Sequence, residues 1–216
     1  MKKVDLSVIK TITNGAVIGL KNFPSLVAVA ILYVLTIWIP YINVGTTIAM
    51  QTLPGRLAKG DVISPLFIFD AKYRDDFSAY FLLCAFIYLS ITIGMIFMWV
   101  PGIVIAISMS LAVMILVDDK VSPTDAMKLS NEATKGYKWK IFFIYVIFSI
   151  ALNIGFLILI AIASIFDSGV FTGILVFVYG ALLIPFSLGI CSVIYRTLYI
   201  ERKSDKETPE ETLMVE

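Results

Sequence analysis

Two uncharged stretches near the C-terminal end decide the fold: IFFIYVIFSIALNIGFLILIAIASIF at residues 141–166 and SGVFTGILVFVYGALLIPFSLGICSVIY at residues 168–195. Each is longer than the roughly 20 apolar residues that an α-helix needs to cross a bilayer core of about 30 Å. One charged residue, Asp167, separates them. The pair therefore predicts a transmembrane helical hairpin.

Two further uncharged stretches lie upstream, at residues 22–55 and 77–117. Each contains a proline two residues after a tryptophan, at Pro40 and at Pro101. Proline ends or kinks a helix, and tryptophan favours the headgroup level of a membrane, so both prolines predict corners between helices. The predicted membrane-spanning helices are residues 24–39, 41–53, 79–100, 101–117, 141–166 and 170–195.

The second of these spans, residues 41–53, is short for a crossing, because 13 helical residues reach only about 20 Å. The helix either continues through Pro54 towards Leu57 or forms a short, broken or re-entrant segment. Before the first span, the apolar residues recur at helical spacing and lysines lie on the other side, which predicts an amphipathic helix on the inner leaflet. Its apolar face comprises Leu6, Ile9, Ile12, Ala16 and Leu20.

The composition agrees with a membrane protein. Of the 216 residues, 59% are apolar and 15% charged, with a mean hydropathy of +0.93. Soluble domains average about 45–50% apolar and about 25% charged residues. The predicted fold is an all-α polytopic bundle: residues 1–203 form one transmembrane domain with a short cytoplasmic helix, and residues 204–216 form an acidic, disordered cytoplasmic tail.

The charges predict the sidedness. Six spans place all 17 basic residues on one side of the membrane and leave Asp167 as the one charge opposite. The positive-inside rule makes the basic side cytoplasmic, so both termini are expected in the cytoplasm, with the protein in the cell membrane. Trp38 and Trp99 then lie at the outer rim and Trp139 at the inner rim. The 16 acidic residues nearly cancel the basic ones, so no nucleic-acid partner is expected.

Catalytic chemistry has few candidates in this chain. The sequence contains no histidine, which is the commonest general base and metal ligand, and the uncharged stretches contain no ionisable residue for ion coupling. We predict no catalytic residue, no metal site and no cofactor. For Asp118 and Asp119 we expect simple solvation, and the alternative is that they bind a cation or a basic partner. A minor alternative for the protein, an enzyme at the lipid interface, would depend on carboxylates in the loops. These are Asp61, Asp70, Asp75, Asp76, Asp118 and Asp119.

The stretch VSPTDAMKLSNEATKG, residues 121–136, predicts a capped cytoplasmic helix. Ser122 is a preferred N-cap, Pro123 suits the first helical position, Asp125 fits a capping box, and Gly136 suits a left-handed end. One interpretation is that these features are only caps and packing. The other is that the helix docks a cytoplasmic partner or gates the bundle, through Ser122, Asp125, Lys128, Lys135 and Gly136.

Residues 100–143 carry a resemblance to a known family. The pattern runs from Pro101-Gly102 through Leu116-Val117-Asp118, Ser122-Pro123, Ala126, Ser130 and Lys135-Gly136 to Trp139. It resembles the uncharacterised bacterial and archaeal relatives of the membrane domain of glycerophosphoryl diester phosphodiesterases. The resemblance implies a polytopic membrane protein. It implies no phosphodiesterase activity, because the family's catalytic residues have no matching positions in a chain without histidine.

Neutral polar and small residues are the remaining candidates within the spans. Asn43, Gln51 and Asn153 either bond to neighbouring helices or line a polar path. Gly102, Ala106 and Ser110 recur every four residues, the small-xxx-small pattern of close helix packing, which we assign to the monomer rather than to a dimer.

These observations favour a membrane protein without enzymatic chemistry that acts as a scaffold, a regulator or an accessory subunit. Its expected partners are membrane lipids and either another protein or a second copy of the chain. The alternative is a facilitator or channel-like carrier of a small or lipidic solute.

Overall fold

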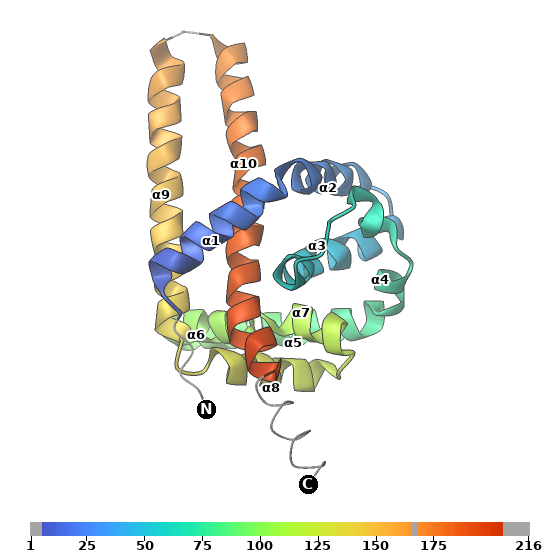
Figure 1. Ribbon diagram of the computed structural model, residues 1–216. Helices are drawn as coiled ribbons and strands as arrows, with labels where there is room; N and C mark the ends of the chain where they lie inside the picture. Colours follow the sequence, from blue (N-terminus) through green and yellow to red (C-terminus); the bar gives the residue numbers. More distant parts are fainter. Residues whose placement is uncertain (1–5, 166–167, 205–216) are drawn as a thin grey trace.

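The computed structural model describes residues 6–165 and 168–204, which form helices and no strand (Figure 1). Most of the predicted tail and the charge at Asp167 lie outside the described residues. In chain order the helices are α1 (Val8–Lys21), α2 (Phe23–Thr36), α3 (Ile42–Lys59), η1 (Pro65–Phe69), α4 (Lys72–Asp75), α5 (Phe77–Phe97), α6 (Trp99–Met109), α7 (Ala112–Asp119), α8 (Pro123–Thr134), α9 (Lys138–Ile165), α10 (Gly169–Tyr195) and the π-helical η2 (Arg196–Ile200). The all-α class is confirmed.

Within the described residues, four helical segments are long and apolar enough to cross a membrane. They are Phe77–Phe97, Trp99–Asp119, Lys138–Ile165 and Gly169–Ser204, with mean hydropathies between 2.2 and 2.7. A fifth results only if α1 and α2, which meet at a bend of 77°, are taken as one broken span. The count is below the predicted six, because α2 has 14 residues and α3 combines apolar residues with Gln51, Arg56 and Lys59.

The predicted corners are present, with shifted boundaries. Near Pro40, α2 ends at Thr36 and α3 begins at Ile42, and Tyr41 between them has a φ of 75°. Near Pro101 the chain turns earlier, at the extended residue Met98, so that this proline lies in the first turn of α6. A proline is tolerated there because the first backbone N–H groups of a helix have no partner within it.

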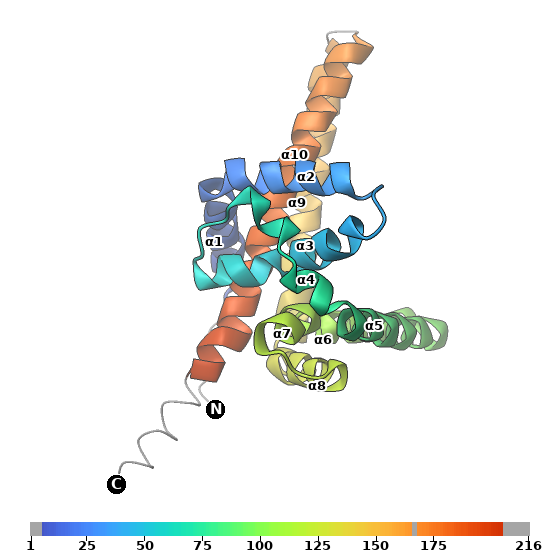
Figure 2. The ribbon, with the colours of Figure 1, turned by 90° about the vertical axis from the view of Figure 1, so that its right-hand side faces the viewer.

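The two longest hairpins leave the molecule in different directions. The hairpin of α9 and α10 stands upright from the body, whereas α5 and α6 run together across its base (Figures 1 and 2). The remaining helices surround the lower half of α10. The predicted helical bundle is therefore present, but its two longest hairpins diverge instead of standing side by side.

The junction of α1 with α10 is the closest helix crossing at the centre of the body (Figure 1). A Cβ atom on Gly19 would lie 2.5 Å from the carbonyl oxygen of Pro185, and one on Gly15 would lie 2.7 Å from the backbone of Ile190. Gly189 contacts the backbone of Gly15 so closely that a methyl group has no room. The amphipathic helix is thus present, but its glycines pack inward, while Ile9 and Leu20 of the predicted apolar face stay exposed.

Two apolar cores hold the body together. One surrounds α3 and the other joins α7, α8 and the end of α10. The first contains Leu26, Ile48, Leu53, Ile68 and Tyr73, and the second contains Leu111, Ile115, Ala126, Ile194 and Leu198. Most residues of α3 are buried in this way, so α3 is a central helix of the body.

Candidate functional site

The helix α8 closes a break between α6 and α7. The break falls at Ser110 and Leu111, inside the predicted span of residues 101–117. The buried hydroxyl of Ser130 donates a hydrogen bond to the carbonyl oxygen of Ser108 at 2.6 Å and accepts one from the backbone N–H of Leu111 at 3.3 Å. Ala126 and Ala133, on the same side of α8, are also buried. A single side chain thus satisfies backbone groups that the break leaves without helical partners.

The opposite face of α8 carries the predicted caps and exposed charges. Ser122 accepts a hydrogen bond from the backbone N–H of Asp125 at 3.2 Å, which confirms the N-cap. The Ser122 hydroxyl also donates to the Asp125 carboxylate at 2.6 Å, and this bond, with Lys128 nearby, lowers the pKa of Asp125. Gly136 has a φ of 83°, as the predicted left-handed end requires. Lys128 and Lys135 are exposed.

The carboxylates of Asp118 and Asp119 end α7, and the expectation that they are simply solvated is wrong. Their side chains are only 15% and 17% exposed. Tyr195 donates to Asp118 at 2.9 Å and Lys59 pairs with the same oxygen at 2.9 Å. This arrangement joins the ends of α3, α7 and α10.

Asp119 has the same two kinds of partner as Asp118, a tyrosine hydroxyl and a lysine ammonium group. Tyr199 donates to its carboxylate, and the ammonium group of Lys203 lies 2.8 Å from it. The rings of Tyr195 and Tyr199 stack at 5.5 Å, as residues four apart on a helix can. Two carboxylates at the C-terminal end of a helix oppose its dipole, so the two lysines offset an otherwise unfavourable charge.

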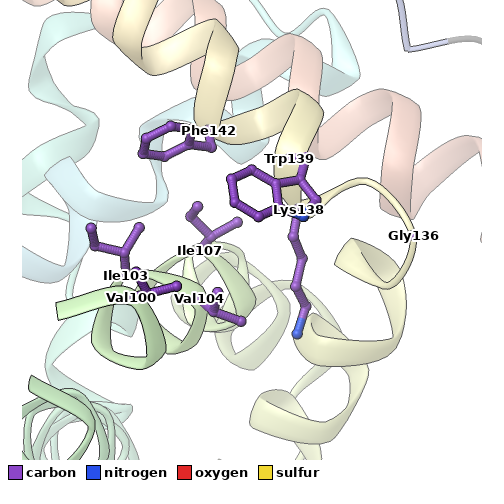
Figure 3. A pocket seen from close by; sticks show the side chains of 8 residues that line it. All are labelled: Val100, Ile103, Val104, Ile107, Gly136, Lys138, Trp139 and Phe142. Carbon is purple, nitrogen blue, oxygen red and sulfur yellow. The ribbon is translucent and has the colours of Figure 1, made fainter. Parts of the chain in front are cut away.

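An apolar groove of about 280 Å³ separates α6 from the foot of α9 (Figure 3). Its walls are side chains of α6 on one side and the first turns of α9 on the other. They are Val100, Ile103, Val104, Ile107, Gly136, Lys138, Trp139 and Phe142. The predicted threading places residues 100 and 139 at opposite faces of the membrane. The groove brings Val100 and Trp139 together, because α6 crosses the foot of α9 instead of running beside it (Figures 1 and 3).

Basic side chains gather at this foot, and we call Lys138, Lys140 and Arg202 the basic foot. Lys138 donates to Asn131 at 3.0 Å. Two cations lie over the ring of Tyr137. The ammonium group of Lys140 is 5.7 Å from the ring centroid, and the guanidinium group of Arg202 is 4.7 Å from it. Arg202 donates to the carbonyl oxygen of Ala133, while its buried Nε has no hydrogen-bond partner among the described residues.

The three amides of the predicted polar path lie on two helices, and their hydrogen bonds are local. Asn43 in α3 donates to the carbonyl oxygen of Ile37, which ties down the corner before α3. Asn153 in α9 donates to Ser149, one turn earlier in its own helix. Gln51 is exposed on α3. The described contacts between helices do not join α3 to α9 closely, so a path through all three remains a prediction.

The predicted packing stripe lies partly in a helix contact within the chain. A Cβ atom on Gly102 would meet the sulfur of Met95, and one on Gly94 would lie 3.0 Å from the Cα atom of Gly102. Ala106 is half-buried on α6, and Ser110 lies beyond the end of that helix, where it bonds to the carbonyl oxygen of Ile107. Gly102 therefore packs α6 against α5.

Several residues of this site escaped sequence reasoning. The spacing of Gly15 and Gly19 is itself a small-xxx-small pattern and offered a signal. Tyr195 and Tyr199 gave a weaker sequence signal, because they are two hydroxyl-bearing residues four positions apart at the end of an apolar span. Nothing local in the sequence indicated that they would contact Asp118 and Asp119.

Comparisons with protein families, with curated proteins and with solved structures found no match. The resemblance over residues 100–143 accordingly stays a prediction. The fold defines a class, that of all-helical proteins with several apolar helices of membrane-spanning length.

Proposed function

We propose that this protein is a membrane protein without enzymatic chemistry that works through contacts, as a scaffold or an accessory subunit of a larger assembly. The observation that carries the proposal is the division of α8 into two faces. Ser130 and Ala126 fasten one face to the body, whereas Asp125, Lys128 and Lys135 project from the molecule. A rigid helix with outward charges of both signs suits a cytoplasmic protein segment with complementary charges.

The contacts around Asp118 and Asp119, which we call the polar cluster, support a structural role for these two carboxylates. Asp118 and Asp119 each contact a tyrosine hydroxyl and a lysine ammonium group, and these contacts link three segments far apart in the chain. Groups engaged in this way stabilise the junction beneath α8. In this proposal the cluster holds the platform on which the partner docks.

The threading that we propose keeps all basic residues on the cytoplasmic side and lets α9 and α10 cross the membrane. The charge pattern requires an even number of crossings but is satisfied equally by two, four or six. Val100 and Trp139 line the same groove at the foot of α9, and this supports a hairpin of α5 and α6 that stays within the inner leaflet. Helices tolerate that position because their backbone groups are satisfied internally.

Charge reversal on α8 tests the docking role. The protein is purified in nanodiscs of native membrane and its intact mass recorded, once as wild type and once with Lys128→Glu and Lys135→Glu. A second polypeptide at fixed stoichiometry is expected with the wild type and lost from the double variant. Lys10→Glu changes an exposed lysine on α1 and should leave the complex intact. A complex that survives the double reversal, or a protein that carries no second polypeptide, contradicts the proposal.

A further inference from the structure

We propose that the groove between α6 and α9 holds one acyl chain of an anionic phospholipid, whose phosphate is bound by the basic foot. This site goes beyond the proposed docking function, because it lies on the membrane-facing side of α9 and involves neither Lys128 nor Lys135. It assigns a ligand class to the apolar groove at the foot of α9.

The walls of the groove fit a hydrocarbon chain. Val100, Ile103, Val104 and Ile107 present branched aliphatic groups from α6, and Phe142 faces them from α9 (Figure 3). Its volume of about 280 Å³ is at the lower end of the about 300–1,000 Å³ of small-molecule pockets, which suits one chain rather than a whole lipid. Trp139 lies at the mouth, and tryptophan is enriched at the level of lipid headgroups.

The charges at the foot fit an anion. Lys138 lines the groove, and Lys140 and Arg202 meet the ring of Tyr137, which directly precedes Lys138. The buried Nε of Arg202 is a donor without a partner among the described residues. The sequence contains no carboxylate between residues 133 and 165. The carboxylates closest along the chain to the basic foot are Glu132, on the exposed side of α8, and Glu201, which pairs with Arg196. The basic foot therefore places positive charge next to an apolar groove. This arrangement complements an anionic lipid, in which a negatively charged headgroup is joined to apolar acyl chains.

The position of α6 is fixed by contacts at the base of its hairpin, so the groove is a built feature of the fold. Ser130 fastens the end of α6, and Lys120 pairs with Asp76 at 2.5 Å where α5 begins. Gly94 and Gly102 bring α5 and α6 together near the tip. A chain in the groove would fill space between two elements that are already held in place.

Fluorescence quenching by brominated lipids tests the site. In a protein with Trp38→Phe and Trp99→Phe, the remaining Trp139 reports on the groove. We expect brominated phosphatidylglycerol to quench it at about fivefold lower mole fraction than brominated phosphatidylcholine, the factor given by one favourable lysine or arginine contact with an anionic lipid. A protein that retains only Trp99, which is 80% exposed at the hairpin corner, should be quenched equally by both lipids.

Two variants separate a defined site from general attraction to anionic lipids. Val104→Phe fills the groove and should abolish the preference at Trp139. Lys138→Gln leaves the aliphatic walls unchanged but removes one charge, and it should also abolish the preference, because about fivefold is the effect of one cationic contact. Ile158→Phe, on an exposed part of α9, is the matched control and should have no effect. Equal quenching by the two lipids, or a preference that survives both Val104→Phe and Lys138→Gln, overturns the proposal.

Discussion

The hydroxyl of Tyr195 donates a hydrogen bond to Oδ2 of Asp118 at 2.9 Å, and this contact joins the end of α10 to the end of α7. The same carboxylate oxygen lies 2.9 Å from the ammonium group of Lys59 at the end of α3. Gly55, one turn before Lys59, lets α3 approach closely, because a Cβ atom there would lie 3.3 Å from Asp118. Three helix ends therefore meet at one carboxylate.

We expect Tyr195→Phe to lower the free energy of unfolding by about 2 kcal/mol, because hydrogen bonds to charged groups contribute about 1.5–3 kcal/mol. The phenylalanine keeps the ring stacked on Tyr199, so the change isolates the hydroxyl. Thermal unfolding in detergent measures the effect. Tyr88→Phe removes a hydroxyl from an exposed tyrosine on α5 and should leave stability unchanged. Equal midpoint temperatures of unfolding for Tyr195→Phe and Tyr88→Phe would show that the hydrogen bond to Asp118 does not stabilise the protein.

The crossing of α1 and α10 gives a second prediction. Gly189→Ala places a methyl group against the backbone of Gly15, so α1 should detach from α10 and its amides should exchange with solvent faster. Gly173→Ala, in the same helix, is the matched control, since nothing lies within 4 Å of a Cβ atom there. Hydrogen exchange followed by mass spectrometry reports on residues 8–21. Unaltered protection of α1 in Gly189→Ala would contradict the close approach.

Removal of the Ser130 hydroxyl should loosen the break between α6 and α7. In Ser130→Ala the buried N–H of Leu111 loses its side-chain acceptor, and an unsatisfied buried group costs about 1–3 kcal/mol. Faster amide exchange at residues 111–115 is expected. Ser90→Ala serves for comparison, because the Ser90 hydroxyl donates to the carbonyl oxygen of Phe86 in its own helix and is partly exposed. Matching exchange rates in both variants would assign Ser130 no role at the break.

The juxtaposition of Val100 and Trp139 predicts sidedness. In a cysteine-free protein, cysteines introduced at Trp99 and at Trp139 should react with a membrane-impermeant thiol reagent from the same, cytoplasmic side. A cysteine at Ser168 should react from the opposite side, because α9 lies between Trp139 and Ser168 and is expected to cross the membrane. Vesicles of both orientations, labelled intact, measure the three positions. Labelling of residue 99 from the outer side would restore the predicted threading with upright spans and overturn the arrangement at the foot.

Local features of this protein were predictable because they depend on neighbouring residues. The length of the uncharged stretches predicted α9 and α10. The N-cap at Ser122 and the left-handed Gly136 predicted the two ends of α8. The two Trp-x-Pro patterns predicted the turns before α3 and near the start of α6. Gly102 of the predicted packing stripe lies against Met95 of α5. Each of these predictions follows from hydropathy, capping or backbone preference over a few residues.

The contacts between helices were not predictable in the same way. A helix that is apolar all round, such as α5, has no polar face to indicate which side is buried or whether it stands upright. The charges fix only that an even number of crossings keeps the basic residues together. The pairing of Asp118 with Tyr195, 77 residues away, depends on how α3, α7 and α10 pack.

The sequence by itself thus determined the helical class, the apolar segments and the caps of α8, because these are set by hydropathy and local backbone chemistry. Only the tertiary structure decided the direction of the α5 and α6 hairpin, the junction at Asp118 and the groove beside Trp139. The physical reason is that such features arise where surfaces from distant segments fit together, and shape complementarity between helices leaves no periodic signal in either one.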